Sequence, residues 1–408
     1  MSYVQIGTSR VRLEKWEDIL LAVGEGLLDE RSYCELKKGL PPPGQNTEVS
    51  RDLASFTVEG GVMVYGISDA GAGKAGEVVG ITDPESAKTR LVGIAMGKVS
   101  PAMVCDVRVV MDPDDSARGC VIVEIPPSPI APHQADERYW GRSSEGKRVL
   151  PEPHVANIFA TRRNRDDGLN EHLLGLAGTF DPVPARDRSH GHLYFTAVPL
   201  TPPVGPPPWD HNKRPMELAV EARFPAHEYG GGDLTSLNYT ETHPRGIMAT
   251  SVSDRELDEL YAKRLLIRDT GGVDFAAGLG TRSRYTGGNR PEATVVPLSV
   301  VLIHVDQCVR LTAHVARLRS DSGTWHLGVH MTSLLGVPSG AALDERSFER
   351  AAKYPEETFT NDVYAPASEM SDSPQRVVEA LMTPLARGLG ALRAFPYESP
   401  VEFMRRNV

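Results

Sequence analysis

The segment Gly60-Gly61-Val62-Met63-Val64-Tyr65-Gly66-Ile67 contains a mostly apolar run that begins directly after a glycine pair. A glycine-rich stretch, residues 68–77, follows it. A short apolar run between two turn signals is typical of a strand buried within a sheet. We therefore predict a central strand at residues 62–67.

Helices and strands alternate around this run. Val49, Leu53 and Phe56 recur at three- and four-residue steps, which indicates a helix with one apolar face, and Thr47 is suited to cap it. The predicted elements are a helix at 13–28, a strand at 31–37, the helix capped by Thr47, the strand at 62–67, a helix at 85–99, hairpin strands at 103–111 and 120–125, a strand at 138–143 and a helix at 152–163. They predict an N-terminal α/β (α+β) domain with a mixed sheet.

The second half of the chain predicts an α+β domain of unknown type. Residues 165–190 are irregular and charged and include prolines, so we place the boundary there and divide the chain into domains 1–168 and 169–408. The predicted elements of this half are strands at 192–200 and 216–224, a proline-rich loop at 201–215, a strand at 324–334 and a helix at 373–389. The long apolar pattern at 297–319 fits a helix or two strands, and we favour the helix. The pattern of this half says little about chemistry.

Composition excludes several classes of protein. The 408 residues carry a net charge of −10, which argues against a surface coated in positive charge but leaves room for a local basic groove. The four cysteines lie far apart without a C-x-x-C pair, which excludes a zinc finger and argues against a disulfide scaffold. A polar N-terminus and the lack of a strongly apolar run of about 20 residues predict a soluble, cytoplasmic protein with no membrane partner.

Three carboxylates and a lysine carry the predicted chemistry: Glu30, Glu35, Lys37 and Asp69. Residues 35 and 37 are two apart on a strand, so their side chains emerge from the same face. If this strand pairs in parallel with the central strand, Asp69 reaches the same edge. Converging carboxylates suit Mg²⁺ or Mn²⁺, and such a metal activates water for phosphodiester hydrolysis. The alternative is an exposed salt bridge between Glu35 and Lys37, with Glu30 ending a helix.

The order of these elements is similar to that of a known family. Glu30-Arg31-Ser32-Tyr33-Cys34-Glu35-Leu36-Lys37 resembles the E-x-x-x-x-E-x-K element that opens the Schlafen AlbA-like domain. Segments 48–61, 62–69, 77–81 and 139–143 resemble the family's helix ending in a Gly-Gly turn, its G-V-x-D strand, its V-V-G-I step and its aromatic-x-R-S strand. The resemblance covers residues 10–165. It departs from the family at Thr57-Val58, where Asn-Thr is usual.

The resemblance implies association with nucleic acid, and RNA is favoured over DNA. It implies a metal-dependent endoribonuclease acting on tRNA-like substrates, in which Glu30, Glu35 and Asp69 hold Mg²⁺ or Mn²⁺ and Lys37 positions water or phosphate. The alternative is a regulator or sensor that binds DNA or RNA without cutting it. A third interpretation, an effector in an antiviral defence system, makes the C-terminal domain the part that recognises a partner. A homodimer is a further expectation.

Basic residues late in the first domain are the expected contacts to a nucleic-acid backbone: Arg138, Arg142, Lys147 and Arg148, with Arg162, Arg163 and Arg165 further along. Tyr139 and Trp140 lie between them and could stack on a base. The alternative is a solvated surface with one buried tryptophan.

Two other motifs resemble a phosphate-binding loop and a metal site but lack residues that these sites need. The segment Gly66 to Ala75 superficially suggests a phosphate-binding loop, but Ser68 and Ala75 replace residues that such a loop needs, so we predict a hairpin loop and no nucleotide cofactor. His190-Gly191-His192 offers two imidazoles, but no third metal ligand is placed by spacing. We predict a surface turn there.

Overall fold

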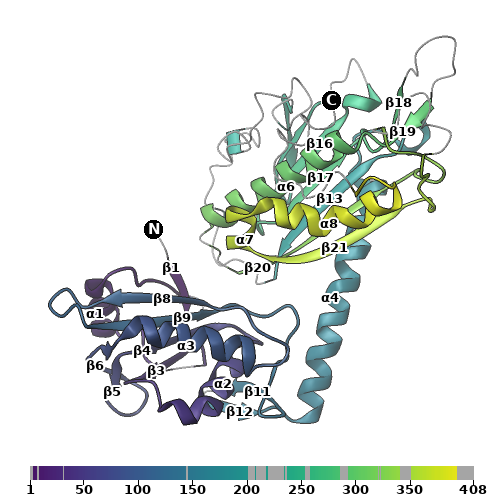
Figure 1. Ribbon diagram of the computed structural model, residues 1–408. Helices are drawn as coiled ribbons and strands as arrows, with labels where there is room; N and C mark the ends of the chain where they lie inside the picture. The colour runs from purple at the N-terminus through teal and green to yellow at the C-terminus, as the bar shows by residue number, and fades with distance from the viewer. Residues whose placement is uncertain are drawn as a thin grey trace. The chain divides into compact units, whose positions relative to one another are not determined.

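The computed structural model describes residues 3–6, 9–30, 32–143, 146–200, 207, 217–218, 234, 237–252, 258–284, 293–319, 321, 323–340 and 351–392. The chain divides into two compact units, unit 1 at Met1–Arg165 and unit 2 at Asp166–Val408. Each unit combines sheets with helices, so the predicted mixed α/β class is confirmed (Figure 1).

Unit 1 is built on the predicted central strand. β4 (Gly61–Tyr65) is buried along its whole length and pairs in parallel with β3 (Cys34–Lys37), as expected. On its other side β4 pairs antiparallel with β9 (Arg118–Ile125). β9 also pairs with β8 (Asp106–Met111) and with the short β7 (Ile81–Thr82), so the predicted hairpin forms one edge of a mixed sheet.

The remaining elements of unit 1 cover this sheet or extend from it. They are β1 (Tyr3–Ile6), β2 (Ser9–Arg12), α1 (Trp16–Gly24), the 3-10 turn η1 (Pro43–Gln45), α2 (Asn46–Ser55), β5 (Ile67–Asp69), β6 (Ala75–Val78), α3 (Pro84–Gly97), β10 (Gln134–Ala135), β11 (Arg138–Ser143) and β12 (Gly146–Val149). The expected loop at 66–75 belongs to the β5–β6 hairpin. The predicted cap of α2 is wrong, because η1 leads directly into the helix and Thr47 is already inside it.

The two faces of the unit 1 sheet have separate cores because side chains alternate along each strand. Met63 and Tyr65 pack with residues of α2 and α3, such as Leu53 and Leu91. Val62 and Val64 face the other way and pack with residues of α1 and the β1–β2 hairpin. Burial on both faces explains why the central strand reads as continuously apolar.

The helix predicted at 152–163 is much longer in the structure. α4 (Glu152–Thr179) continues through the stretch predicted to be irregular and ends sixteen residues later. The prediction is wrong because Leu169, Leu173 and Leu176 recur at three- and four-residue steps and are buried. Leu173 and Leu176 of this apolar stripe pack with Tyr194 and Leu266 of the unit 2 sheet, and Leu169 lies beside Gly328, so tertiary burial extends the helix despite its charged residues.

Unit 2 contains a seven-stranded antiparallel sheet in the order β14-β15-β16-β17-β13-β20-β21. Its elements are the 3-10 turns η2 (Ala185–Asp187) and η5 (Glu259–Tyr261), the strands β13 (Leu193–Pro199), β14 (Tyr239–His243), β15 (Gly246–Thr250), β16 (Lys263–Arg268), β17 (Val273–Ala277), β18 (Arg282–Arg284), β19 (Ala293–Val295), β20 (Thr324–Met331) and β21 (Phe359–Pro366), and the helices α6 (Leu298–Leu318), α7 (Ala367–Asp372) and α8 (Pro374–Gly388). The predicted helices at 297–319 and 373–389 and the strands at 192–200 and 324–334 are confirmed.

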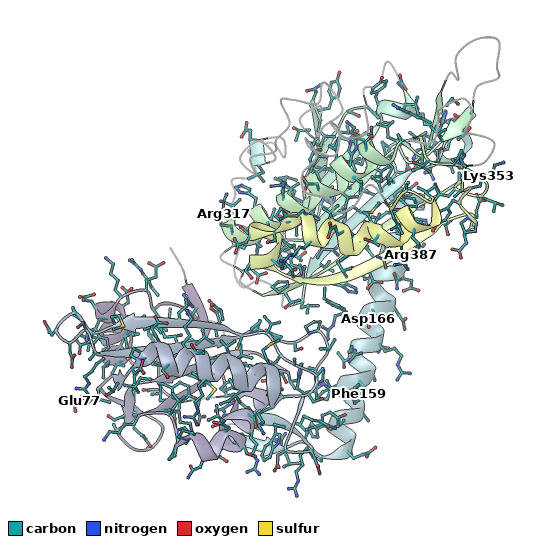
Figure 2. The ribbon with its side chains drawn as sticks, viewed as in Figure 1. Glu77, Phe159, Asp166, Arg317, Lys353 and Arg387 are labelled. Carbon is teal, nitrogen blue, oxygen red and sulfur yellow. The ribbon has the colours of Figure 1, made fainter. Side chains whose placement is uncertain are left out.

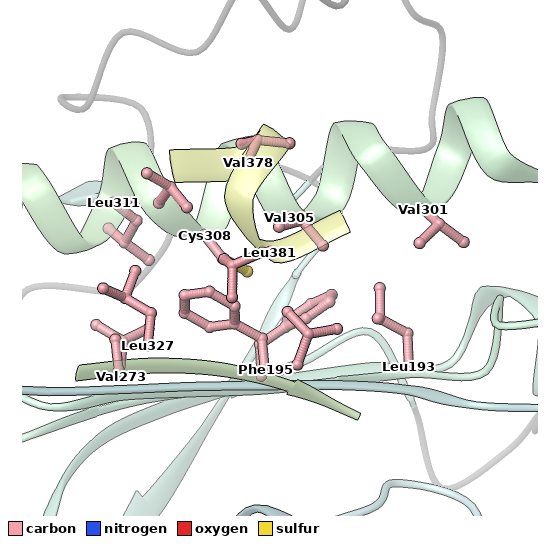
Figure 3. Close-up of a cluster of buried hydrophobic side chains, with 14 of the residues drawn as sticks. Leu193, Phe195, Val273, Val301, Val305, Cys308, Leu311, Leu327, Val378 and Leu381 are labelled. Carbon is pink, nitrogen blue, oxygen red and sulfur yellow. The ribbon is translucent and has the colours of Figure 1, made fainter. Parts of the chain in front are cut away.

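The main core of unit 2 lies between one face of this sheet and the helices α6 and α8. Phe195 and Leu327 of the sheet meet Val305 and Cys308 of α6, and Leu381 of α8 closes the cluster (Figure 3). The other sheet face is partly polar, because Asp274 accepts hydrogen bonds there from Thr196 at 2.7 Å and Arg268 at 3.1 Å. α4 therefore packs against a face with both apolar and charged groups.

α6 is the only helix in the described part of the chain that is long and apolar enough to cross a membrane. Most of its apolar window, 78%, is buried inside unit 2. The strand predicted at 216–224 and the proline-rich loop at 201–215 lie almost entirely outside the described residues.

Truncation of Phe195 to alanine should destabilise unit 2 strongly. The ring is fully buried between the sheet and α6, and removal of such a side chain leaves a cavity that costs about 3–5 kcal/mol. Urea denaturation followed by tryptophan fluorescence measures the change. Leu335→Ala, at a side chain that is 61% exposed, is the matched control and should cost less than about 0.5 kcal/mol. A loss below about 1 kcal/mol in Phe195→Ala would contradict the packing described here.

Candidate functional site

The predicted acidic residues of unit 1 lie on three different elements. Glu35 and Lys37 project from the same face of β3, as their spacing predicts, while Cys34 points into the opposite core. Glu30 precedes β3, and one of its carboxylate oxygens accepts a hydrogen bond from the Leu36 backbone N–H at 3.0 Å. Asp69 ends β5, where its carboxylate accepts from the Gly71 N–H at 2.7 Å.

Glu35 is held between two cations. Its Oε1 accepts a hydrogen bond from Lys37 at 2.5 Å, and its Oε2 accepts one from the Arg142 guanidinium of β11 at 2.6 Å. Arg142 also donates to the Ser32 carbonyl at 3.1 Å and lies 4.2 Å from the ring centroid of Phe56. Both carboxylate oxygens of Glu35 are therefore occupied by protein partners.

Two further carboxylates extend this contact into a network. Asp52 of α2 accepts a hydrogen bond from Lys147 of β12 at 2.5 Å and lies 4.0 Å from Lys37. Glu48, one turn earlier on the same helix face, also pairs with Lys147. We call the set Glu35, Lys37, Glu48, Asp52, Arg142 and Lys147 the ion-pair network. It contains three carboxylates and three cations, so its formal charge is zero.

Burial and pairing have opposite effects on the ionisation of these groups. Burial alone would raise the pKa of Glu35, but hydrogen bonds from Lys37 and Arg142 lower it below the ordinary value. For Asp52 burial dominates, so its pKa is raised even though Lys147 lowers it. Glu35 is thus firmly ionised and its charge is already balanced within the protein.

These residues do not fit a divalent metal in the arrangement that the structure shows. Among the described residues no group of three His, Cys, Asp or Glu side chains is placed to hold a metal ion. Glu35 offers no free oxygen, and Glu30 and Asp69 each use an oxygen on a backbone N–H. A hard cation needs several free oxygen ligands and an excess of negative charge, and the neutral network supplies neither.

A groove of about 450 Å³ opens beside the network, at the carboxyl ends of β3 and β4. Its lining includes the charged Lys37, Lys38, Glu48 and Asp52 and the buried Tyr65. Lys38 is exposed, whereas Lys37 is tied to Glu35. The groove therefore has charges of both signs along its wall.

Most of the residues expected to contact nucleic acid are engaged within the protein, and a few are exposed. Arg142 and Lys147 belong to the ion-pair network. Trp140 is buried, and its indole N–H donates to the Ala135 carbonyl at 2.8 Å, which removes its ring from base stacking. Tyr139 packs edge-on against Phe159 of α4, with ring centroids 6.0 Å apart. Arg138 remains exposed at the start of β11.

Three arginines lie on the same sides of β12 and α4 as the Tyr139–Phe159 contact; Arg148 and Arg163 are exposed and Arg162 is half-buried. Arg148 is paired with Gly141 in the β11–β12 register, so it shares the hairpin face of Tyr139. Phe159 lies on α4 (Figure 2). Arg162 and Arg163 follow it by three and four residues, so they share its side of the helix. We call Arg148, Arg162 and Arg163 the basic surface. None of the three forms an ion pair with a carboxylate among the described residues; Arg162 donates to the Ile130 carbonyl at 3.3 Å.

Sequence reasoning missed Glu48 and Asp52, which complete the network. Their signal was present, because residues four apart on a helix lie on one face, and α2 carries both. The sequence does not show that the β11–β12 hairpin approaches α2 and brings Lys147 to Glu48 and Asp52, which are 99 and 95 residues earlier in the chain.

Loss of Arg142 should destabilise unit 1. Arg142→Ala leaves the largely buried Glu35 carboxylate with one cation instead of two, and breaking such a pair costs about 3–5 kcal/mol. Urea denaturation measures this loss. Arg148→Ala removes an arginine of the same hairpin that is exposed and unpaired among the described residues, and it should change stability by less than about 0.5 kcal/mol. Equal effects of the two variants would refute a stabilising role for the network.

The contribution of Glu35 to stability should depend on pH. Its pKa is lower in the folded than in the unfolded chain, so its stabilisation is present above the unfolded value and is lost as the pH falls through the folded value. The difference in unfolding free energy between the wild type and Glu35→Gln should be constant from pH 7 to about 5 and shrink below about 4.5. Denaturation curves at several pH values test this. A difference that grows on acidification would have the wrong sign.

The sequence matches no protein-family model and no curated protein, so membership of the Schlafen AlbA-like family stays a prediction. Among solved structures, one similar chain is the N-terminal domain of a protein from Nitrosomonas europaea described as related to the ATP-dependent DNA helicase RecG. It is 18% identical over 32% of this chain and 88% of that domain, with a TM-score of 0.25. The DIP2311 protein of Corynebacterium diphtheriae is 13% identical over 50% of this chain and 34% of its own length, with a TM-score of 0.24. Both TM-scores are too low for the likeness to bear on function.

Proposed function

We propose that unit 1 is a nucleic-acid-binding module that contacts the phosphate backbone through the basic surface. The observation that carries the proposal is the contrast between two sets of charges in one unit. The ion-pair network is neutral and internally satisfied, whereas Arg148, Arg162 and Arg163 have no carboxylate partner among the described residues.

The local charge supports this proposal. Residues 138–165 contain seven lysines and arginines and two glutamates, and Arg142 and Lys147 are the two of the seven that the ion-pair network neutralises, within a chain whose net charge is −10. Clustered cations on an otherwise acidic protein attract a polyanion to one place and not to the whole surface. The guanidinium of arginine also matches a phosphate in geometry, because it donates two parallel hydrogen bonds.

The expected mode of binding is electrostatic. Trp140 is buried and Tyr139 is engaged with Phe159, so neither ring is offered freely to a base. Contacts to phosphate position a nucleic acid without reading its sequence. We therefore propose binding with little sequence preference, and the resemblance of unit 1 to the Schlafen AlbA-like family favours RNA over DNA as the ligand.

The proposal is binding and not metal-dependent cleavage. Endonuclease chemistry at Glu30, Glu35 and Asp69 would need carboxylate oxygens free for a metal, and the contacts of these residues do not favour it. The non-catalytic alternative therefore agrees better with the geometry. A role in defence has no support among the described contacts.

Charge reversal on the basic surface should weaken binding. In fluorescence anisotropy with labelled tRNA, an RNA hairpin and duplex DNA, Arg148→Glu and Arg163→Glu should each reduce affinity about tenfold or more, and each should lower the slope of log affinity against log salt by about 1. Binding should persist in EDTA. Arg118→Glu is the control, since Arg118 is exposed at the start of β9 and outside the basic surface.

Two results would contradict the proposal. Equal loss in Arg118→Glu and in the basic-surface variants would show that only total charge matters. Cleavage that requires Mn²⁺ and disappears in Glu35→Gln would instead establish the nuclease, and would mean that Glu35 exchanges its protein partners for a metal.

A further inference from the structure

A serine, a histidine and a glutamate meet in unit 2, which has no part in the function proposed above. The Nε2 atom of His190 lies 3.3 Å from the Ser283 hydroxyl oxygen, and its Nδ1 atom lies 3.1 Å from a carboxylate oxygen of Glu259. The three residues come from the segment before β13, from β18 and from the start of η5. Tertiary folding thus places a hydroxyl on one side of an imidazole and a carboxylate on the other.

This order of groups is the one that activates a serine for attack. A histidine removes the serine proton only if the ring nitrogen facing the hydroxyl is free to accept it. A carboxylate at the other nitrogen favours the tautomer with its N–H on Nδ1, which leaves Nε2 as the acceptor. Glu259 and Ser283 occupy those two positions around His190.

Glu259 is suited to the orienting role because it is held firmly. It accepts hydrogen bonds from the backbone N–H groups of Ser189 at 2.7 Å and His190 at 2.9 Å, and it lies 3.0 Å from Nε2 of His192. Burial alone would raise the pKa of Glu259, but the hydrogen bonds from Ser189, His190 and His192 lower it to about 2. The carboxylate is therefore ionised at neutral pH.

His192 anchors the same carboxylate from the interior. The sequence predicts a surface turn at His190-Gly191-His192, and this prediction is wrong for His192, which is fully buried. Its Nδ1 lies 2.6 Å from Asp181, whose carboxylate also accepts a hydrogen bond from the Tyr194 hydroxyl at 2.5 Å. Both ring nitrogens of the buried His192 therefore contact carboxylates, and one of these, Glu259, is 67 residues away in the sequence, so the local pattern does not indicate this arrangement.

Glycines allow the segments of this cluster to approach so closely. A Cβ atom on Gly191 would lie 2.2 Å from the Thr332 carbonyl oxygen, and one on Gly278 would lie 1.8 Å from the Glu259 carbonyl oxygen. The Gly191 N–H donates to the Thr281 hydroxyl at 2.6 Å, which ties the histidine segment to the chain leading into β18. Backbone contacts therefore set the distance between His190 and Ser283.

Ser283 is a better nucleophile candidate than the nearby Ser189. The Ser189 hydroxyl lies 2.5 Å from Glu259 and 2.9 Å from Nδ1 of His190, so it is on the side of the ring that holds the carboxylate. Among the described residues, Ser283 is the one hydrogen-bond partner at Nε2, the nitrogen left to accept a proton. His190 is 17% exposed and Ser283 is half-buried, so solvent reaches this side of the cluster.

We propose that Ser283, His190 and Glu259 form a hydrolytic site for carboxylic esters. Ser283 Oγ attacks the ester carbonyl carbon while His190 Nε2 takes its proton, and the bond to the alcohol oxygen breaks as His190 returns that proton to the leaving alcohol. Water then attacks the acyl-serine with His190 again as the base, the carboxylic acid leaves, and Ser283 recovers its proton. Glu259 acts as a positioning residue for the ring.

Covalent labelling of the full-length protein tests this proposal directly. A fluorophosphonate probe should modify the wild type at Ser283, as identified by mass spectrometry of the tryptic peptide, and the protein should hydrolyse p-nitrophenyl acetate with release of p-nitrophenol. Ser283→Ala should abolish labelling and reduce hydrolysis at least 100-fold, since the nucleophile is gone. Ser116→Ala, at an exposed serine outside the cluster, is the matched control and should still be labelled at Ser283.

Further variants separate catalysis from folding. His190→Gln should reduce labelling about 100-fold with thermal unfolding close to that of the wild type. Glu259→Gln should shift the pH profile of labelling, which a purely structural role would not do. Absence of probe at Ser283 in the folded wild type, or hydrolysis unchanged in Ser283→Ala, would overturn the proposal. Loss of labelling in Ser189→Ala, with labelling unaffected in Ser283→Ala, would identify Ser189 as the nucleophile and would also overturn it.

Discussion

The position of Glu35 between Lys37 and Arg142 is the contact on which the arrangement of unit 1 depends. It joins the strand next to the central strand of the sheet to a hairpin more than 100 residues later in the chain. A largely buried carboxylate destabilises the fold unless it is paired with a cation. Glu35 on β3 therefore depends on the arginine that the hairpin supplies. The ion pair between Asp52 and Lys147 joins α2 to the hairpin in the same way.

This pairing also decides which charges of unit 1 remain available to a ligand. Cations that face α2 and β3 are neutralised by carboxylates, whereas arginines on the α4 side of the hairpin have none among the described residues. A polyanion is attracted by uncompensated charge, so the number of basic residues in a segment is a poor guide to binding. The alternation of side chains along β11 and β12 divides the basic residues between the two groups.

In unit 2, histidines take the place of lysine and arginine as the partners of carboxylates. His192 is fully buried between Asp181 and Glu259, and the latter also holds His190. Such a cluster is stable only when each polar group finds a partner, and the glycine contacts at 191 and 278 allow the chains to come close enough. The hydroxyl of Ser283 then lies at the ring nitrogen that the carboxylates leave free.

The sequence by itself determined the local elements with clear periodicity. The apolar strand at 62–67, the same-face placement of Glu35 and Lys37, and the helix at 373–389 follow from local patterns that depend on neighbours only, whereas the structure decided between a helix and two strands at 297–319. The sequence did not predict the length of α4, because burial of Leu169, Leu173 and Leu176 within unit 2 extends that helix. Only the tertiary structure decided which charged side chains meet, because partners such as Arg142 and Glu35, or Glu259 and His190, are 69 to 107 residues apart and their distance is set by how sheets and helices pack.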